Sequence, residues 1–281
     1  APEVWNRFIH SELTLFMAVP TIYSKLVSAW EKAPEKERQE MSRSCARLRL
    51  MVSGSAALPI DLFEKWEQIS SHRLLERYGM TEFGMALSNP LEGERRAGFV
   101  GLPLPQVEVR LTDASGRVLT QENQAGEIQV RSEGLFQDYL GHPEATKQAF
   151  QDGWFRTGDE GIVENGYYRI LGRSSIDIIK SGGHKISALE IEEVFRTHPL
   201  IIECAVVGIA DEEWGERICA AVIPSSDASL FPEELRRWGK ERLAPYKNPT
   251  EWVMVTELPR NTMGKVIKPA IKKWFQSRGS S

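Results

Sequence analysis

The chain has 281 residues, of which 41% are hydrophobic and 26% are charged, the composition of an ordinary globular protein. Its 35 basic and 39 acidic residues give a net charge of −4, which argues against nucleic-acid binding driven by overall positive charge. No apolar run approaches the roughly 18 residues of a membrane-spanning helix. The length favours about two domains.

The three cysteines, Cys45, Cys204 and Cys219, form no CxxC pair, so neither a disulfide framework nor a zinc site is expected. A reducing intracellular compartment follows, either the cytoplasm or the mitochondrial matrix. The first residues lack the basic and apolar regions of a targeting peptide. Their abrupt start suggests a chain cut from something longer, in which case an import signal would lie on the absent portion.

The first part of the chain predicts alternating strands and helices. Residues 14–19 and 48–52 are short strand candidates, and the charged segment 31–43 is expected to be a solvated helix face or loop. A helix begins near Pro59, with apolar residues at helical spacing, and a strand follows at 74–78. This order predicts a doubly wound parallel sheet in an α/β fold.

From Gly98 onward the pattern changes to short alternating strands at 107–111, 126–130 and 167–171, separated by turn signals. These predict a small antiparallel subdomain over 98–173.

A third pattern begins near Gly172. Ser187 and Glu190 form a capping box that opens a helix. Strands at 204–209 and 218–223 and a helix at 232–243 follow. We place the domain boundary at about Ser174, giving a large domain over 1–173 and a small α+β domain over 174–281.

The segment Tyr78-Gly79-Met80-Thr81-Glu82 follows a predicted strand, where a loop at the carboxyl end of a parallel sheet can meet a nucleotide. Tyr78 supplies a flat ring for a base, and Thr81 a hydroxyl for a phosphate. Glu82 supplies a hard oxygen ligand for Mg²⁺. A plain turn with a surface carboxylate would explain the same residues.

Two further motifs carry charged groups. Thr157-Gly158-Asp159 places a carboxylate at an expected turn, where it can accept hydrogen bonds from a ribose diol, although an Asx-turn would explain it equally. Lys265 follows Gly264, so the backbone can bend and the ammonium can enter a cleft. There it would offset the negative charge that opposes carboxylate attack on an α-phosphate.

These motifs occur in the order 78–82, 157–159, 172–173, 180–183 and 259–265. Their order and spacing resemble the adenylate-forming superfamily of acyl-CoA synthetases, luciferases and adenylation domains, whose later half the chain would cover. The resemblance implies an acid–thiol ligase that uses ATP, Mg²⁺ and CoA, with small-molecule substrates and no nucleic-acid, integral-membrane or protein partner.

The resemblance also implies roles for single residues. Thr81 and Glu82 would contact ATP and Mg²⁺, Tyr78 would stack on adenine, and Asp159 and Arg173 would reach the ribose and phosphates. Lys265 would be the adenylation lysine. The remaining nucleotide-site residues would be Gly54, Ser55 and Ala56, in the loop between adenine and the acyl pocket, with Gly79 and Met80.

In the second half-reaction, the resemblance implies that the small domain rotates and presents a glycine-rich segment to the pantetheine arm of CoA. The residues in question are Lys180, Gly182, Gly183 and His184. The hinge is expected near Ser174-Ser175. The chain departs from the common pattern by one additional residue between Arg173 and Gly183 and by this serine pair.

The run Gly93-Glu94-Arg95-Arg96 follows the nucleotide motif, where a guanidinium could grip a second carboxylate. With the segment 74–90, it resembles malonyl-CoA synthetases specifically, and Arg95, then Arg96, would clamp malonate. Alternatives are two surface arginines, a short- or medium-chain fatty acyl-CoA synthetase, or an inactive remnant that acts as a binding module.

The family also needs a phosphate loop rich in Ser, Thr and Gly, which residues 1–52 do not contain. We therefore expect a carboxyl-terminal fragment that does not turn over ATP alone at an appreciable rate.

Overall fold

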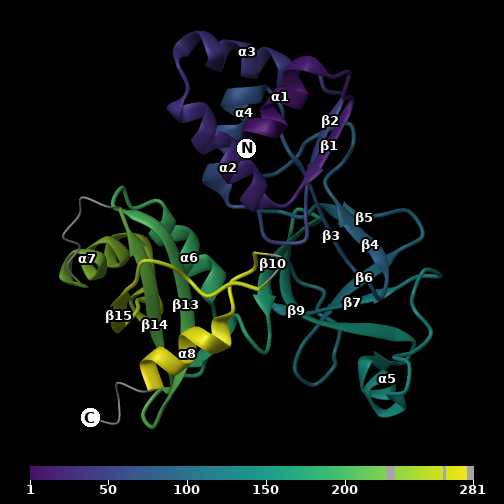
Figure 1. Cartoon of the computed structure of the whole chain (residues 1–281). Helices are drawn as coiled ribbons and strands as arrows, with labels where there is room; N and C mark the ends of the chain where they lie inside the picture. Colours follow the sequence, from purple (N-terminus) through teal and green to yellow (C-terminus); the bar gives the residue numbers. More distant parts are fainter. Residues whose placement is uncertain (226–231, 262–263, 277–281) are drawn as a thin grey trace. The chain divides into compact units, whose positions relative to one another are not determined.

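A computed structural model describes residues 1–225, 232–261 and 264–276 (Figure 1). By its internal contacts the chain divides into two compact units. Unit 1 comprises Ala1–Thr157 and Gly161–Ile170, and unit 2 comprises Gly158–Glu160 and Leu171–Ser281. In the part of the chain that the structure describes, no helix combines the length and apolar character needed to cross a membrane.

The first sheet of unit 1 has five strands in the order β1-β2-β3-β4-β5. The pairs β1–β2 and β2–β3 are parallel, as the alternating pattern predicts, whereas β3–β4 and β4–β5 are antiparallel. The strands are β1 (Leu15–Ala18), β2 (Leu50–Ser53), β3 (Leu75–Met80), β4 (Gly84–Ser88) and β5 (Leu102–Pro103).

Helices α1 to α4 pack into one core cluster with this sheet. Aromatic rings fill its centre: the rings of Trp5 and Trp66 stack with centroids 6.0 Å apart, and Tyr23 meets Trp66 edge-on at 5.0 Å. The charged segment 31–43 lies mostly in helices α2 and α3, which is one of the two expected alternatives. The helices are α1 (Pro2–His10), α2 (Pro20–Lys32), α3 (Glu35–Ala46) and α4 (Ile60–Ser70).

A second sheet has the order β10-β9-β7-β6, with β8 paired to β9. The three predicted strands are confirmed as β6, β7 and β10, but β9 was not predicted. It contains Gly161, where a Cβ atom would lie 2.8 Å from Ile128 and 3.0 Å from the Arg169 carbonyl, so a residue that usually weakens strands here permits close packing. The elements are β6 (Glu108–Thr112), β7 (Gly126–Arg131), α5 (Pro143–Ala149), β8 (Phe150–Gln151), β9 (Trp154–Glu164) and β10 (Tyr167–Arg173).

Unit 2 is built on a sheet in the order β12-β11-β14-β13, with β15 paired to β14. The predicted helix cap is confirmed, because Ser187 Oγ accepts a hydrogen bond of 3.2 Å from the Glu190 amide. The elements are β11 (Ile178–Ser181), β12 (His184–Ser187), α6 (Ala188–Arg196), β13 (Ile201–Asp211), β14 (Gly215–Pro224), α7 (Pro232–Arg242), a 3₁₀ turn (Pro245–Lys247), β15 (Glu251–Met254) and α8 (Lys268–Gln276).

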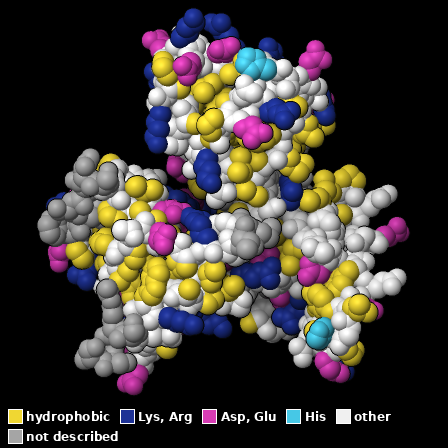
Figure 2. All heavy atoms as spheres, in the orientation of Figure 1, with side chains coloured by type: hydrophobic (Ala, Val, Ile, Leu, Met, Phe, Trp, Pro, Cys, Tyr) yellow, Lys and Arg dark blue, Asp and Glu magenta, His cyan; other side chains and the backbone are white. Residues whose placement is uncertain are grey.

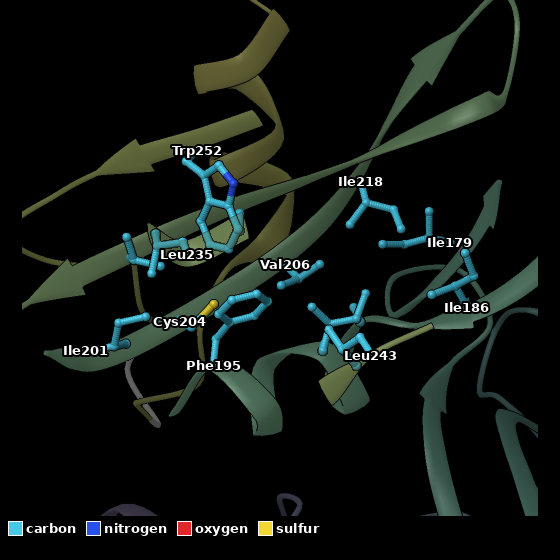
Figure 3. Close-up of a cluster of buried hydrophobic side chains, with 14 residues drawn as sticks. Ile179, Ile186, Phe195, Ile201, Cys204, Val206, Ile218, Leu235, Leu243 and Trp252 are labelled. Atoms are coloured by element: carbon cyan, nitrogen blue, oxygen red, sulfur yellow. The ribbon is translucent and has the colours of Figure 1, made fainter. Parts of the chain in front are cut away.

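Alternate residues of β13 belong to two different cores, as the two-residue repeat of a strand requires. Cys204 and Val206 pack with α6, α7 and Trp252, where the rings of Phe195 and Trp252 meet edge-on at 4.8 Å (Figure 3). Ala205 and Val207 pack with α8. Basic and acidic side chains are interspersed over the visible surface, consistent with the small net charge (Figure 2).

Candidate nucleotide and acyl-group site

The nucleotide motif lies partly on a strand rather than wholly on a loop. Tyr78, Gly79 and Met80 belong to β3, and only Thr81 and Glu82 lie in the turn to β4. The strand continues because Gly79 pairs with Met85 at a register shift, and a Cβ atom on Gly79 would lie 2.0 Å from the Gly84 carbonyl oxygen. Only glycine fits this approach of the two backbones.

Two residues from the segment between β7 and α5 hold Glu82 in place. Tyr139 Oη donates a hydrogen bond of 3.0 Å to Glu82 Oε1, and the Phe136 amide donates one of 2.7 Å to the Glu82 carbonyl. Sequence reasoning missed Tyr139, because 57 residues separate it from Glu82 and no local pattern marks it. The carboxylate is therefore oriented by a distant loop.

Tyr78 is mostly buried, with 9% of its surface exposed. Its ring lies 5.7 Å from that of Phe83, in the core of the antiparallel region. Stacking on adenine, which the resemblance implies, would use the small part of the ring that unit 1 leaves open.

The loop 53–57 lies beside β3. Ser53 ends β2 and pairs with Glu76, and Glu76 Oε1 accepts a hydrogen bond of 3.0 Å from the Leu58 amide. A Cβ atom on Gly54 would lie 2.7 Å from Arg77 Nε, so the guanidinium packs directly on the loop. Neither Glu76 nor Arg77 was predicted as a site residue.

The two candidate acyl-site arginines are placed differently. Arg95 donates to three main-chain carbonyl oxygens, those of Arg73 (2.7 Å), Leu91 (2.8 Å) and Pro90 (3.2 Å). A guanidinium has five N–H donors, so these bonds orient Arg95 without exhausting its capacity. Arg96 lies over the ring of Tyr167, 4.0 Å from its centroid, and pairs with Glu94 at 3.0 Å.

In unit 2, Asp159 and Arg173 lie together, with Arg173 Nε 3.1 Å from Asp159 Oδ1. The prediction of a turn at Asp159 was wrong, because Thr157-Gly158-Asp159 lies within β9. Gly158 has φ +71°, a left-handed conformation within the strand that glycine adopts readily. The Asp159 side chain is 10% exposed and that of Arg173 is 39% exposed.

Next to Asp159, the buried Glu160 links the expected hinge to the glycine-rich hairpin. Its Oε1 accepts from Ser174 Oγ at 3.1 Å and lies 2.8 Å from Lys185 Nζ. Sequence reasoning missed Glu160 because acidic residues occur throughout this segment and only the fold shows which of them is enclosed.

The candidate CoA segment is a β-hairpin formed by β11 and β12. Gly182 (φ +54°) and Gly183 (φ +79°) form its turn, with the left-handed conformation of a type I′ hairpin. The Gly182 amide donates to the Trp214 carbonyl at 2.9 Å, and His184 stacks on Tyr246 with centroids 4.4 Å apart. The Lys180 amide donates to Glu216 at 2.7 Å.

Lys265 projects from a short loop near the end of the chain, and its side chain is exposed. Its amide donates to Asn261 Oδ1 at 2.9 Å, and Arg260 Nη1 donates to the Gly264 carbonyl at 2.6 Å. Gly264 has φ +82°, so the bend expected from this glycine is present. Thr262 and Met263 of the same motif lie outside the described residues.

A cluster of three or more His, Cys, Asp or Glu side chains that could enclose a metal is absent from the described ranges. Glu82 is a single oriented carboxylate. Mg²⁺ is commonly held by one or two carboxylates together with substrate phosphates rather than by a protein cage. The arrangement therefore fits a Mg²⁺ ion that arrives with ATP.

Comparisons with known proteins identify the family of the chain. The AMP-binding enzyme family model matches residues 1–140, and the model of the AMP-binding enzyme C-terminal domain matches residues 190–265. The mitochondrial malonate–CoA ligase of Mus musculus is 46% identical over 304 residues, 99% of this chain and 52% of that protein. The malonate–CoA ligase of Arabidopsis thaliana is 48% identical over 298 residues, 98% of this chain and 48% of that protein.

Among solved structures, ATP-bound MatB from Rhodopseudomonas palustris superposes with a TM-score of 0.89 at 34% identity, covering 99% of this chain and 53% of that one. The chain thus spans about half the length of the curated relatives it matches. With both family models matched in order and the motifs in the expected sequence, the chain belongs to the AMP-binding, adenylate-forming enzyme family.

Proposed function

We propose that the chain is part of a malonate-activating acid–CoA ligase. The reaction converts ATP, malonate and CoA into malonyl-CoA, AMP and pyrophosphate through a malonyl-adenylate. The observation that carries this proposal is the identity of 46% and 48% to two malonate–CoA ligases over 99% and 98% of the chain. The compartment would be the mitochondrial matrix or the cytoplasm, and the mouse relative is named as mitochondrial.

For the nucleotide, we assign the ribose to Asp159 and Arg173. The Arg173 guanidinium, 3.1 Å away, orients the Asp159 carboxylate, whose oxygens are the kind of acceptor that a ribose diol needs. Glu82, oriented by Tyr139, would hold Mg²⁺, and Thr81 would contact a phosphate. When bound, Mg²⁺ supplies positive charge that neutralises the phosphate oxygens.

Adenylation requires one carboxylate of malonate to attack the α-phosphate, which expels pyrophosphate. Both reactants are anionic, so their approach is opposed and negative charge accumulates on the transferred group. The ammonium of Lys265, carried on an exposed loop, would offset this charge. The second carboxylate of malonate would be held by Arg95 or Arg96, since a guanidinium binds a carboxylate in a two-pronged manner.

In the second half-reaction the CoA thiol attacks the acyl carbonyl and releases AMP. We assign the approach of the pantetheine arm to the hairpin turn at Gly182 and Gly183, because residues without side chains leave room for a narrow ligand. Lys180 and His184 flank the turn and would contact the more polar parts of CoA.

The test is a hybrid ligase, in which this chain replaces the segment it matches in the Arabidopsis malonate–CoA ligase. We expect malonate-dependent pyrophosphate release and malonyl-CoA formation, with butyrate at least tenfold poorer in kcat/KM. Lys265→Ala should lower adenylation by about 100-fold, the order of loss seen when one charge-stabilising group is removed. Lys272→Ala is the matched control, because Lys272 is another lysine of unit 2 and lies seven residues after Lys265.

The competing functions predict different results in the same hybrid. A fatty acyl-CoA synthetase would prefer butyrate or longer acids, and Arg95→Leu or Arg96→Leu would not impair it. An inactive remnant would give a hybrid without activity, although the parent ligase is active. Equilibrium dialysis of the 281-residue chain against ATP separates these cases further, because a remnant need not bind nucleotide.

A further inference from the structure

Lys268 is a buried cation that the reaction scheme does not use. It is the first residue of α8 and is 6% exposed. Its Nζ lies 2.7 Å from Asp177 Oδ1 and 2.8 Å from Glu192 Oε1. Burial by itself lowers the pKa of Lys268, but Glu192 and Asp177 outweigh it and hold the pKa above its ordinary value, so the side chain is charged.

Helix formation does not explain a lysine at this position. The first turn of a helix carries partial positive charge and favours acidic residues, yet α8 has none in its first turn. A buried ion pair is also a weak source of stability, since desolvation consumes much of its attraction. The position of Lys268 is therefore better explained by the elements that its ion pairs connect.

The two carboxylates lie on separate elements. Asp177 follows the expected hinge: its Oδ2 accepts from the Arg173 amide at 3.0 Å, and its own amide donates to the Arg173 carbonyl at 2.7 Å. Glu192 lies on α6, and its Oε1 also accepts from the Val206 amide at 2.8 Å. Lys268 thus joins the turn 173–177, helix α6 and the start of helix α8.

Two of these elements, α6 and α8, pack on opposite faces of the sheet. Helix α6 packs on the face of β13 that carries Val206, whereas α8 packs on the face that carries Val207. Strand β13 ends the main strand order of the sheet, and the Glu192 carboxylate covers its edge at Val206. The Lys268 ammonium therefore connects α8, on one face of the sheet, to Glu192 of α6, on the other face, around the edge at β13.

Two functional residues adjoin the ends of this connection. Lys265 precedes Lys268 by three residues in the chain. It lies in a short hairpin that is closed by an antiparallel bridge between Arg260 and Val266 and leads directly into α8. At the other end, Arg173 begins the turn that Asp177 closes and pairs with Asp159.

We propose that Lys268 is a positioning residue that fastens the Lys265 loop to the turn 173–177, so that Lys265 moves together with the hinge end of unit 2. The proposal rests on the proposed function for the importance of Lys265, but not for the coupling itself. With the clamp in place, a rotation about the hinge carries Lys265 as part of one body. Without it, the loop moves independently of the turn.

Hydrogen–deuterium exchange on the 281-residue chain tests the coupling without requiring activity. We expect Lys268→Met to raise amide exchange about tenfold in both segments, 173–177 and 264–267, while the central strand β14 keeps its protection. Lys268→Arg restores the charge and should bring exchange within about threefold of the unchanged chain. Lys272→Met, on the same helix with its Nζ 3.9 Å from Glu216, is the matched control and should change neither segment.

Asp177→Asn is a second variant in case Lys268→Met does not fold. In this variant Lys268 keeps Glu192 as a partner. Amide exchange in 264–267 should still increase, although Asp177 is distant in sequence. The proposal is overturned if Lys268→Met and Asp177→Asn leave 264–267 at the original rate, if only one segment responds, or if all of unit 2 exchanges faster to the same extent.

The hybrid ligase gives the functional readout. Lys268→Met should lower kcat for adenylation about tenfold with the KM for ATP changed less than threefold, and Lys268→Arg should recover most of it. If Lys265→Ala proves fully active, the assigned role of Lys265 fails while the exchange result still decides the coupling.

Discussion

The hydroxyl of Tyr139 donates a hydrogen bond of 3.0 Å to Oε1 of Glu82, so the carboxylate assigned to Mg²⁺ is oriented by a residue 57 positions away. A bond to a charged acceptor contributes about 1.5–3 kcal/mol. We expect Tyr139→Phe in the hybrid ligase to raise the Mg²⁺ concentration for half-maximal activity several-fold, because Glu82 is then free to rotate.

The ring of Tyr139 still packs on Phe136 in this variant, with centroids 4.7 Å apart in the parent chain. Tyr168→Phe is the control, since it also removes a hydroxyl, one that donates to the Val109 carbonyl at 3.0 Å. An unchanged Mg²⁺ requirement in Tyr139→Phe would show that the hydroxyl does not orient the metal ligand.

Asp159→Asn tests the ribose assignment. The amide keeps the shape of the side chain but loses the charge that pairs with Arg173 and one acceptor oxygen. We expect the KM for ATP in the hybrid ligase to rise at least tenfold, while the KM for CoA changes little. Glu144→Gln, at an exposed position of α5, should leave both constants unchanged. Equal effects on ATP and CoA would instead indicate a general loss of structure.

Phe195→Ala tests the core of unit 2. Phe195 is 0% exposed and meets Trp252 edge-on, and removal of a buried aromatic ring costs about 3–5 kcal/mol. We expect guanidinium unfolding of the chain to show this loss in unit 2 only, with the transition of unit 1 unmoved. The eight tryptophans are spread over both units, so hydrogen–deuterium exchange at increasing denaturant assigns each transition to its unit. A single transition shifted as a whole would mean that the two units unfold together.

His72 makes the stability of unit 1 depend on pH. Burial lowers its pKa, and the charge of Arg95 acts in the same direction, although the Cys45 carbonyl, 3.1 Å from Nε2, favours the protonated form. The depressed pKa means that the unfolded chain binds the proton more tightly. Stability is therefore present above the unfolded value near pH 6.5 and falls as the pH decreases below it.

We expect the free energy of unfolding to decrease between pH 7.5 and pH 5.5, and the decrease to be smaller in His72→Gln. Denaturant titrations of both chains at the two pH values measure the free energy of unfolding. Subtracting the pH-dependent change of His72→Gln from that of the parent cancels the contribution of all other groups. His142→Gln is the control and should behave as the parent. Equal slopes in His72→Gln and the parent would contradict the prediction.

The sequence by itself determined the identity of the family and part of the order of elements. Apolar spacing after Pro59 and the capping box at Ser187 are local signals, so helix α4 and helix α6 were predictable. The motifs around Glu82, Asp159 and Lys265 were also recognisable, because each depends on residues that are adjacent in the chain.

The tertiary structure alone decided which groups meet. Strand β9 was missed because its glycines suggest turns, and only the neighbouring Ile128 shows why a glycine is required there. Tyr139 reaches Glu82, Glu160 meets Lys185, and Lys268 lies between Asp177 and Glu192, each across a long stretch of sequence. Such contacts depend on how strands and helices pack, and no short-range pattern records that packing.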